Sequence, residues 1–519
     1  MRKPPASRRK NMNLNNKLIP TALAAALLLA GCSLIPTYER PAAPVPTTYP
    51  GDPAQPAGPA ASSIPWQDFF TDPRLAGLIQ TALANNRDLR VSVLNIEQAR
   101  AQFQIQRADL FPALGLSGNG SRSSPNPYQA IDSSQGSVTS QYSVNLGITA
   151  WEIDFFGRIR ALKDQALAQY LATDETRKAA QISLIAAVAN GWLTVLADDE
   201  LLEITRQTLS TREESVRLTK LRFDNGVSSE LDFQAANSLA ETARAAYAQQ
   251  LRTRQQDENA LALLLGAPVP ASAFAGAKGL GGIHPIPDVP AGLPSDLLAE
   301  RPDIRAAEQQ LIGANANIGA ARANFFPRVS LTTSIGTASS EFSNLFDRGT
   351  KAWSFAPTVT LPIFDAGRNI AGLDSAKAGR EIAVAQYEKS IQTAFREVAD
   401  ALAGRATFGE QARAQRAQAD AEAVRFKLSD LRYRNGVASA LDLLDAQRSL
   451  FTAQQSAVTT QLQLLQNQVT LYKTLGGGWA SRDAAAAGTA TSGASGGAPP
   501  AATTGAASTP PAVVIRRKG

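Results

Sequence analysis

One helical corner occurs twice in this chain, and the duplication constrains the fold more than any other sequence feature. Residues 432–450 read RYRNGVASALDLLDAQRSL, and residues 222–240, 210 positions earlier, read RFDNGVSSELDFQAANSLA. In each copy an Asn-Gly pair supplies the left-handed backbone that ends a helix. A Ser-x-x-Asp run then begins the next helix as a capping box. We therefore expect one large unit built from two repeats.

The first repeat is predicted to occupy residues 66–266. A proline-free stretch with helical spacing, residues 75–110, predicts a single helix that ends before a Phe-Pro pair. A β-hairpin of about residues 112–150 follows, because apolar and small polar residues alternate there. Two further helices complete the repeat, a very long one over about 158–225 and a second over 231–265.

A segment rich in proline and glycine, residues 267–302, links the first repeat to the second. The second repeat is predicted to occupy residues 303–479 and to follow the same plan. Its β-hairpin is expected at about residues 327–363, where alternation extends through Leu361 and Ile363. Residues 480–519 have an Ala/Gly/Ser/Thr/Pro composition of low complexity, which predicts a disordered tail.

The net charge of +6 invites a nucleic-acid-binding interpretation, but the position of the charges argues against it. Residues 1–31 contain no acid and six basic residues, which are Arg2, Lys3, Arg8, Arg9, Lys10 and Lys17. Subtracting these six leaves the remainder of the chain near neutrality. We therefore expect no nucleic-acid partner.

Residues 1–31 are predicted to be a secretory signal peptide, whose apolar run is too short to span a membrane. The run ends in Leu-Ala-Gly-Cys, which resembles the bacterial lipoprotein signal and implies a covalent lipid on Cys32. An ordinary signal peptide with an incidental cysteine is the alternative, and Met12 is a second possible start. Residues 32–65 are rich in proline and are expected to form an extended, acylated tether.

The scarcity of reactive side chains excludes most enzyme chemistry. Cys32 is the only cysteine and His284 the only histidine, and no Gly-Lys-Ser/Thr phosphate loop is present. These counts exclude a disulfide within one chain, a His/Cys metal site and histidine-dependent catalysis. We expect no catalytic residue, no metal and no cofactor other than the lipid.

The predicted strands require more than one chain. Four strands of about ten residues, alternating apolar and small polar, are typical of an outer-membrane barrel. Four strands cannot close, and open edges are not tolerated in lipid. Two chains would give a plugged barrel of eight strands and three a barrel of twelve with a lumen. The alternative is a soluble trimeric coiled-coil protein whose strands form a small sandwich.

Several motifs resemble the outer membrane factor family, most closely its OprM/NodT-type lipoproteins and more distantly TolC. They are the two N-G-V-x-S-x-L-D corners, WQDFFTDPRL (66–75), ALANNRDLRV (82–91) and LDLLDAQRSLFTAQQ (441–455). The resemblance covers about residues 30–479. It implies a mainly α-helical chain that trimerises into a membrane β-barrel, continued by a long periplasmic α-helical barrel.

The resemblance also implies a function and its partners. The protein would be an exit duct for drugs or other small toxic compounds in the outer membrane of a Gram-negative bacterium. It would act with a periplasmic adaptor and an inner-membrane transporter of the resistance-nodulation-division (RND) type. Two alternatives stay open, namely the exit duct of a type I protein secretion system and an envelope scaffold without conductance.

By the same resemblance, Leu441, Asp442 and Asp445 fall where such proteins narrow their periplasmic entrance. The residues expected to meet the adaptor are the corner tips, Asn225, Gly226, Val227, Asn435, Gly436 and Val437. Asp232 and Asp442 also have a simpler explanation, since each stands third after a capping serine. Asp445 lacks that explanation because its counterpart in the first repeat is Ala235.

Overall fold

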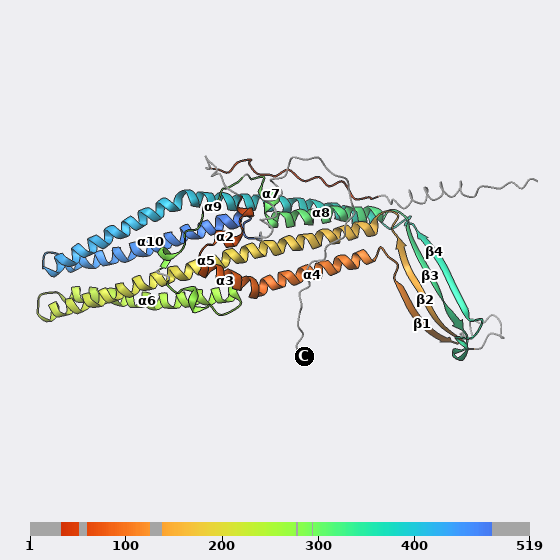
Figure 1. Cartoon of the computed structure of the whole chain (residues 1–519), viewed down its shortest axis with the longest axis horizontal. Coiled ribbons are helices and arrows are strands. Elements are labelled where there is room, and N and C mark those ends of the chain that lie inside the picture. Colours follow the sequence, from red (N-terminus) through yellow and green to blue (C-terminus); the bar gives the residue numbers. More distant parts are fainter. Residues whose placement is uncertain (1–32, 51–59, 125–137, 277–278, 293, 480–519) are drawn as a thin grey trace, which may run out of the picture.

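The computed structural model describes residues 33–50, 60–124, 138–276, 279–292 and 294–479. The chain is elongated, with a sheet at one end and the helical corners at the other (Figure 1). The helices are α2 (Trp66–Phe69), α3 (Pro73–Asn85), α4 (Arg87–Ala108), α5 (Arg158–Asp224), α6 (Glu230–Leu265), α7 (Leu297–Glu300), α8 (Pro302–Ala323), α9 (Arg368–Arg434) and α10 (Ala440–Thr474). The predicted signal peptide, Cys32 and the 480–519 tail lie outside the described residues.

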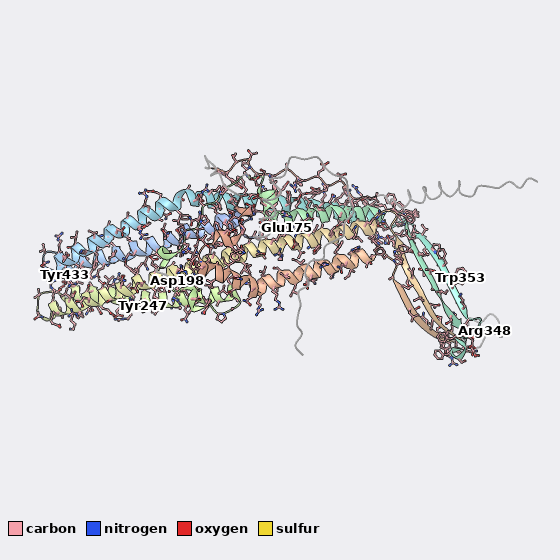
Figure 2. The ribbon with its side chains drawn as sticks, viewed as in Figure 1. Glu175, Asp198, Tyr247, Arg348, Trp353 and Tyr433 are labelled. Carbon is pink, nitrogen blue, oxygen red and sulfur yellow. The ribbon has the colours of Figure 1, made fainter. Side chains whose placement is uncertain are left out.

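Four antiparallel strands form one sheet in the order β1 (Leu114–Ser123), β2 (Thr139–Ile153), β3 (Arg328–Ser339) and β4 (Lys351–Thr360). Within the described chain, β1 and β4 each pair on one side only. Large apolar side chains lie exposed on these edge strands, including Leu114, Leu116, Trp353 and Phe355 (Trp353 is labelled in Figure 2). The sheet therefore has two open edges and uncovered apolar surface.

Both hairpins lie where the alternation predicted them, with one difference at the end of the second. Leu361 and Ile363 were expected to continue the last strand, but β4 ends at Thr360. Pro362 explains the end of the strand, because proline has no N–H for the ladder and restricts the residue before it. The hairpin loop between residues 124 and 138 lies largely outside the described residues.

The two longest helices, α5 and α9, have 67 residues each, or about 100 Å at 1.5 Å per residue. Each begins at the end of a strand, after an aspartate that caps it. The Asp154 carboxylate accepts from the Ile159 and Arg160 N–H groups at 3.2 and 2.9 Å, and Asp365 accepts from the Asn369 N–H at 2.9 Å. The predicted helix starts and the corners at Asn225 and Asn435 are confirmed.

Next to the sheet, the helices form a layer in the order α4, α5, α8 and α9, each packing on the next. We call this part the upper layer. Toward the corners the order becomes α6, α5, α10 and α9, so that two helical hairpins, α5–α6 and α9–α10, lie side by side (Figure 1). The helices of the upper layer thus follow the same order as the strands that they extend.

The helix predicted over residues 75–110 is instead two helices, which meet at Asn86. The Asn86 side chain accepts from the Leu89 N–H at 2.8 Å and donates to the Leu264 carbonyl at 2.9 Å. Asn86 thereby ends α3, caps α4 and contacts the end of α6. An asparagine with a helix-capping role can break a helix without proline or glycine.

The apolar core lies midway along the molecule. The Phe69 ring stacks on Tyr472 with 3.9 Å between ring centroids, and the Trp192 indole donates to the Ala273 carbonyl at 3.0 Å. Among the described helices, only α5 is long and apolar enough to cross a membrane by length and composition. However, 56% of its most apolar window is buried inside the protein, as is typical of a core helix.

Residues 33–50, which we call the strap, contain no helix or strand but are docked along α8. Ile35 lies so close to Gly319 that a Cβ there would come within 2.5 Å of it. Asn315 donates to the Pro36 carbonyl at 2.7 Å. The buried Glu308 carboxylate accepts from Arg40 at 2.7 Å and from the Tyr38 hydroxyl at 3.0 Å. The predicted free tether is therefore, in this part, a bound segment.

Candidate functional site

The two corners lie together at the end of the molecule farthest from the sheet (Tyr433 in Figure 2). Each glycine has the left-handed backbone predicted for it, with φ of 71° at Gly226 and 75° at Gly436. The next N–H returns to the helix in both copies, from Val227 to Arg222 at 2.8 Å and from Val437 to Arg432 at 2.9 Å. This pattern is the Schellman ending of a helix.

The second helix of each hairpin begins with a complete capping box. Ser229 and Asp232 cap α6, and Ser439 and Asp442 cap α10, in each case reciprocally. The serine hydroxyl hydrogen bond holds the pKa of Asp232 and that of Asp442 below the usual range for aspartate. Both carboxylates therefore already have a role in helix initiation.

The tips of the corners present apolar side chains to solvent. Val227 and Val437 are 68% and 67% exposed, and Leu441 is 71% exposed. A single exposed valine needs no explanation, but three at one end of the chain form an uncovered apolar surface. The six residues predicted to meet the adaptor, 225–227 and 435–437, all lie on this surface.

Leu441 and Asp445 are four residues apart on α10 and share one face of that helix. Asp445 forms an ion pair with Arg425 on the preceding helix, α9, and Arg425 also contacts Glu422. The acids expected to form charged rings therefore have partners within the chain, Asp442 in its cap and Asp445 in this pair. Sequence reasoning missed Arg425.

Several polar contacts join the two hairpins just inside the corners. The Arg222 guanidinium lies 4.6 Å from the centre of the Tyr433 ring and donates to the Tyr433 carbonyl at 3.3 Å. Gln447 donates to the Ser215 hydroxyl at 2.7 Å in a buried position. These residues hold α5 against α9 and α10, and nothing in the repeat pattern distinguishes them from their unpaired counterparts.

One buried acid lies farther along the α5–α6 hairpin, at Asp198 (Figure 2). It accepts a hydrogen bond from Gln250 at 2.9 Å. Burial, reinforced by the neighbouring Asp257 carboxylate, raises the pKa of Asp198 to about 7. No group of three or more possible metal ligands occurs among the described residues.

Comparison with known proteins places these features in a family. The outer membrane efflux protein family matches residues 78–267 and 293–477. The antibiotic efflux pump outer membrane protein ArpC of Pseudomonas putida is 48% identical over 468 residues, which cover 89% of this chain and 96% of ArpC. The toluene efflux pump outer membrane protein TtgC, from another strain of that species, matches to the same extent.

Among solved structures, the open state of the MtrE outer membrane channel of Neisseria gonorrhoeae is similar with a TM-score of 0.78. The two share 42% identity, and the match covers 86% of this chain and 99% of MtrE. The fold, with its strands, long helices and paired corners, is thus the fold of an outer membrane channel. The chain belongs to the outer membrane efflux protein family and is a non-enzymatic channel component of an efflux system in the outer membrane.

Proposed function

We propose that three copies of this chain close into one duct through the open edges of the protomer. One observation carries the proposal: the sheet and the upper layer end at matching edges, β1 with α4 on one side and β4 with α9 on the other. A sheet in lipid has to pair its edges. Three copies would bring together twelve strands, enough for a lumen.

The edges of the upper layer support closure by the same chain. No residue of α4 is buried within the protomer. Leu94 and Ile105 of α4 are both more than half exposed, as are Ile370 and Ile382 of α9. Apolar side chains of this size on two opposite edges fit packing of α9 against α4 of the next copy.

We further propose that the duct works with a periplasmic adaptor and an inner-membrane RND-type transporter. The exposed apolar tips at 225–227 and 435–437 support an adaptor contact, because they lie at the end of the helices farthest from the sheet. The names of ArpC and TtgC refer to antibiotic and toluene efflux, which supports small amphipathic or apolar compounds as the exported class.

At the same end, Leu441, Asp442 and Asp445 are proposed to narrow the entrance. Around a three-fold axis, the exposed Leu441 side chains would form an apolar constriction beside two sets of acids. Such a combination restricts a pore and favours cations. The ion pair with Arg425 would then set how much of the Asp445 charge a passing ion meets.

The trimer is tested by mass measurement in detergent and by conductance in planar bilayers. Leu94→Glu combined with Ile105→Glu should abolish both the trimer and its conductance, because it places charges at an apolar contact. The matched control is Val93→Glu, an exposed residue about 100° around the same helix. If the double variant remains a conducting trimer, α4 is not the closing edge.

Lipidation is a separate proposal, supported by the Leu-Ala-Gly-Cys run and by the strap that follows it. Cys32→Ser should abolish labelling by radioactive fatty acid, while the strap keeps its contacts with α8. An unmodified wild-type N-terminus that is cleaved at another residue would disprove the assignment.

A further inference from the structure

The upper layer has two faces of different chemistry, and the strap marks one of them. On α8 the strap touches Glu308, Asn315, Gly319 and Arg322, which form one stripe along the helix. Gln310, Gly313 and Asn317 form another stripe, about 160° away at 100° per residue. The strap therefore covers one face of the layer and leaves the other face free.

Amide side chains dominate the free face. A groove of about 580 Å³ between α4 and α5 is lined mainly by Asn95, Gln98, Gln102, Gln106, Gln165 and Gln169. A second groove of about 280 Å³, between α5, α8 and α9, shares Gln165 and Gln169 and adds Gln310 and Asn317. Since two residues line both grooves, the grooves lie on the same face of α5.

This amide face, as we call it, carries no ionisable side chain in either groove. The remaining lining residues are small or uncharged, such as Ala99, Ala166, Thr173 and Ser375. The α9 part of the second groove consists only of Gly372, Ser375, Ala376 and Gly379. Four helices thus contribute to one continuous neutral surface.

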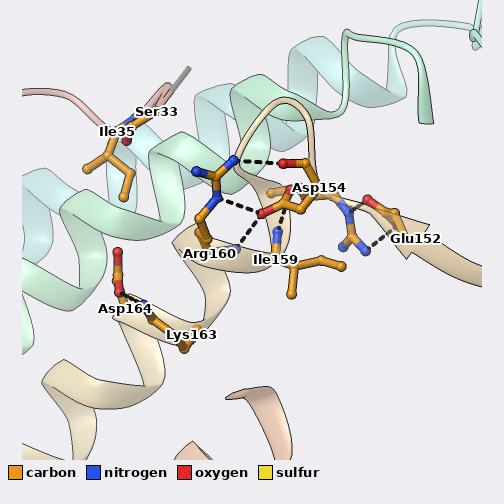
Figure 3. A network of polar contacts seen from close by, with 9 residues as sticks. Ser33, Ile35, Glu152, Asp154, Ile159, Arg160, Lys163 and Asp164 are labelled. Atoms are coloured by element: carbon orange, nitrogen blue, oxygen red, sulfur yellow. Dashed lines mark hydrogen bonds and ion pairs between the residues drawn. The ribbon is translucent and has the colours of Figure 1, made fainter. Parts of the chain in front are cut away.

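Charged groups collect instead on the side of the strap. Figure 3 shows Arg160 with Asp154, and Lys163 with Asp164, next to Ser33 and Ile35 of the strap. Farther along α5, Lys178 pairs with Asp174 and Glu175. The separation of charge from amides follows the two faces of the layer, so a difference in surroundings explains it.

We infer that the amide face lines the duct, and that this stretch admits solutes without regard to the sign of their charge. The inference rests on the proposed ring, in which one face of the layer has to point toward the axis. The strap leads toward the proposed lipid anchor at Cys32, and lipid surrounds the ring, so the face carrying the strap points outward. The amide face then points inward.

The chemistry of amides fits this role. Each amide both donates and accepts hydrogen bonds, so the surface holds water without attracting either sign of ion. It also offers few apolar side chains on which hydrophobic solutes could adsorb or at which the duct could dewet. Selection by charge would then belong to the acids at the entrance, and the upper duct would pass cationic, anionic and neutral amphiphiles alike.

Cysteine labelling tests the inference, with two glutamines of the same helix as a matched pair. Gln102 lines the amide groove, while Gln104 is exposed about 200° around α4. Channels carrying Gln102→Cys or Gln104→Cys are reconstituted in planar bilayers and treated with a cationic or an anionic methanethiosulfonate. Wild-type channels, whose only cysteine is Cys32, give the baseline.

At Gln102→Cys we expect both reagents to react at rates within about threefold of each other, as a neutral surface requires. The attached positive group should shift ion selectivity toward anions and the negative group toward cations. Gln104→Cys should change neither conductance nor selectivity.

Two results would overturn the inference, and neither is the failure of the channel itself. A response at Gln104→Cys without one at Gln102→Cys would mean that the faces are reversed. Cationic labelling of Gln102→Cys that is faster than anionic labelling by about tenfold would mean that the stretch is electronegative. If the wild-type protein conducts no ions, the proposed duct fails, and the labelling experiment cannot be mistaken for that result.

Discussion

The two corners share one turn but differ in what fastens them to the rest of the chain. Both glycines are left-handed, both asparagines donate to the carbonyl four residues before at 2.7 Å, and both capping boxes are complete. At the first corner, Arg222 reaches across to Tyr433 of the second hairpin. At the second corner, Asp445 pairs with Arg425 of its own hairpin.

The difference teaches that the repeat preserves backbone geometry and varies side-chain contacts. A turn is fixed by local φ/ψ and by caps, so duplication retains it. Contacts between hairpins depend on neighbours that are not repeated, so they can diverge. The same holds along the helices, where Asp198 and Asp257 of the first hairpin correspond to Phe408 and Asn467 of the second.

The largest expected effect concerns this acid pair, which only the first hairpin has. Because the folded pKa of Asp198 lies above the ordinary aspartate value, the folded chain binds more protons between about pH 4 and pH 7. Stability should therefore fall as pH rises through this window, by about 2 kcal/mol between pH 5 and pH 8 after local relaxation.

Asp198→Asn should remove this pH dependence, as measured by chemical unfolding of the solubilised protein at both pH values. Asp420→Asn, which changes an exposed acid on α9, is the control and should leave the slope unchanged. An unchanged slope in Asp198→Asn would mean that the hairpins do not differ in buried charge.

The second prediction tests the identity of the two turns. Gly226→Ala and Gly436→Ala should each cost about 1–2 kcal/mol, since a left-handed backbone is strained for alanine. Nothing lies within 4 Å of a Cβ at either position, so only the backbone contributes. Hydrogen exchange of the corner amides should report equal losses, and unequal losses would break the equivalence of the corners.

The third prediction uses the caps to separate the corners. Ser439→Ala should cost about 1 kcal/mol through the lost cap. Ser229→Ala should cost less, because the Ser228 hydroxyl still donates to Asp232 at 3.1 Å and Ala438 offers no such donor. Local hydrogen exchange at the starts of α6 and α10 measures both, and the reverse order would contradict the assignment of Ser228.

The smallest change in stability, below about 0.5 kcal/mol, belongs to the exposed Asp445–Arg425 pair. Its effect on conduction should be clearer. Asp445→Ala should raise single-channel conductance and weaken cation preference, more strongly together with Leu441→Ala. Arg425→Ala should strengthen cation preference, because it removes the partner of the carboxylate.

Asp232→Ala is the control for these channel measurements, since it should affect only the start of α6. A wild-type conductance and selectivity in all Asp445 variants, with changes in Asp232→Ala, would place the constriction in the first repeat.

The long helices could be predicted from the sequence because their ends are encoded locally. Asp154, Asp365 and the Asn-Gly corners act within a few residues of the boundaries that they set. The break at Asn86 could not be predicted in this way, because one of its two hydrogen bonds reaches Leu264, 178 residues away. Likewise, composition predicted an extended segment at the strap but not its docking on Glu308.

The partner of Asp445 was missed although a signal for it exists. An antiparallel hairpin brings together residues equally far from its corner, and Arg425 and Asp445 each stand ten positions from Asn435. Reflection through the corner would have found the pair. No comparable rule predicts the contact of Arg222 with Tyr433, because it joins separate hairpins whose offset depends on packing.

The matching order of strands and helices has a genetic consequence. In a ring of three copies, each subunit would supply one side of a strand seam and one side of a helix seam, so a single defective subunit spoils both of its contacts. A chain that can join at one edge only should poison mixed rings. With equal expression of that chain and the wild type, about one ring in eight would be entirely wild type, so the defect should be dominant.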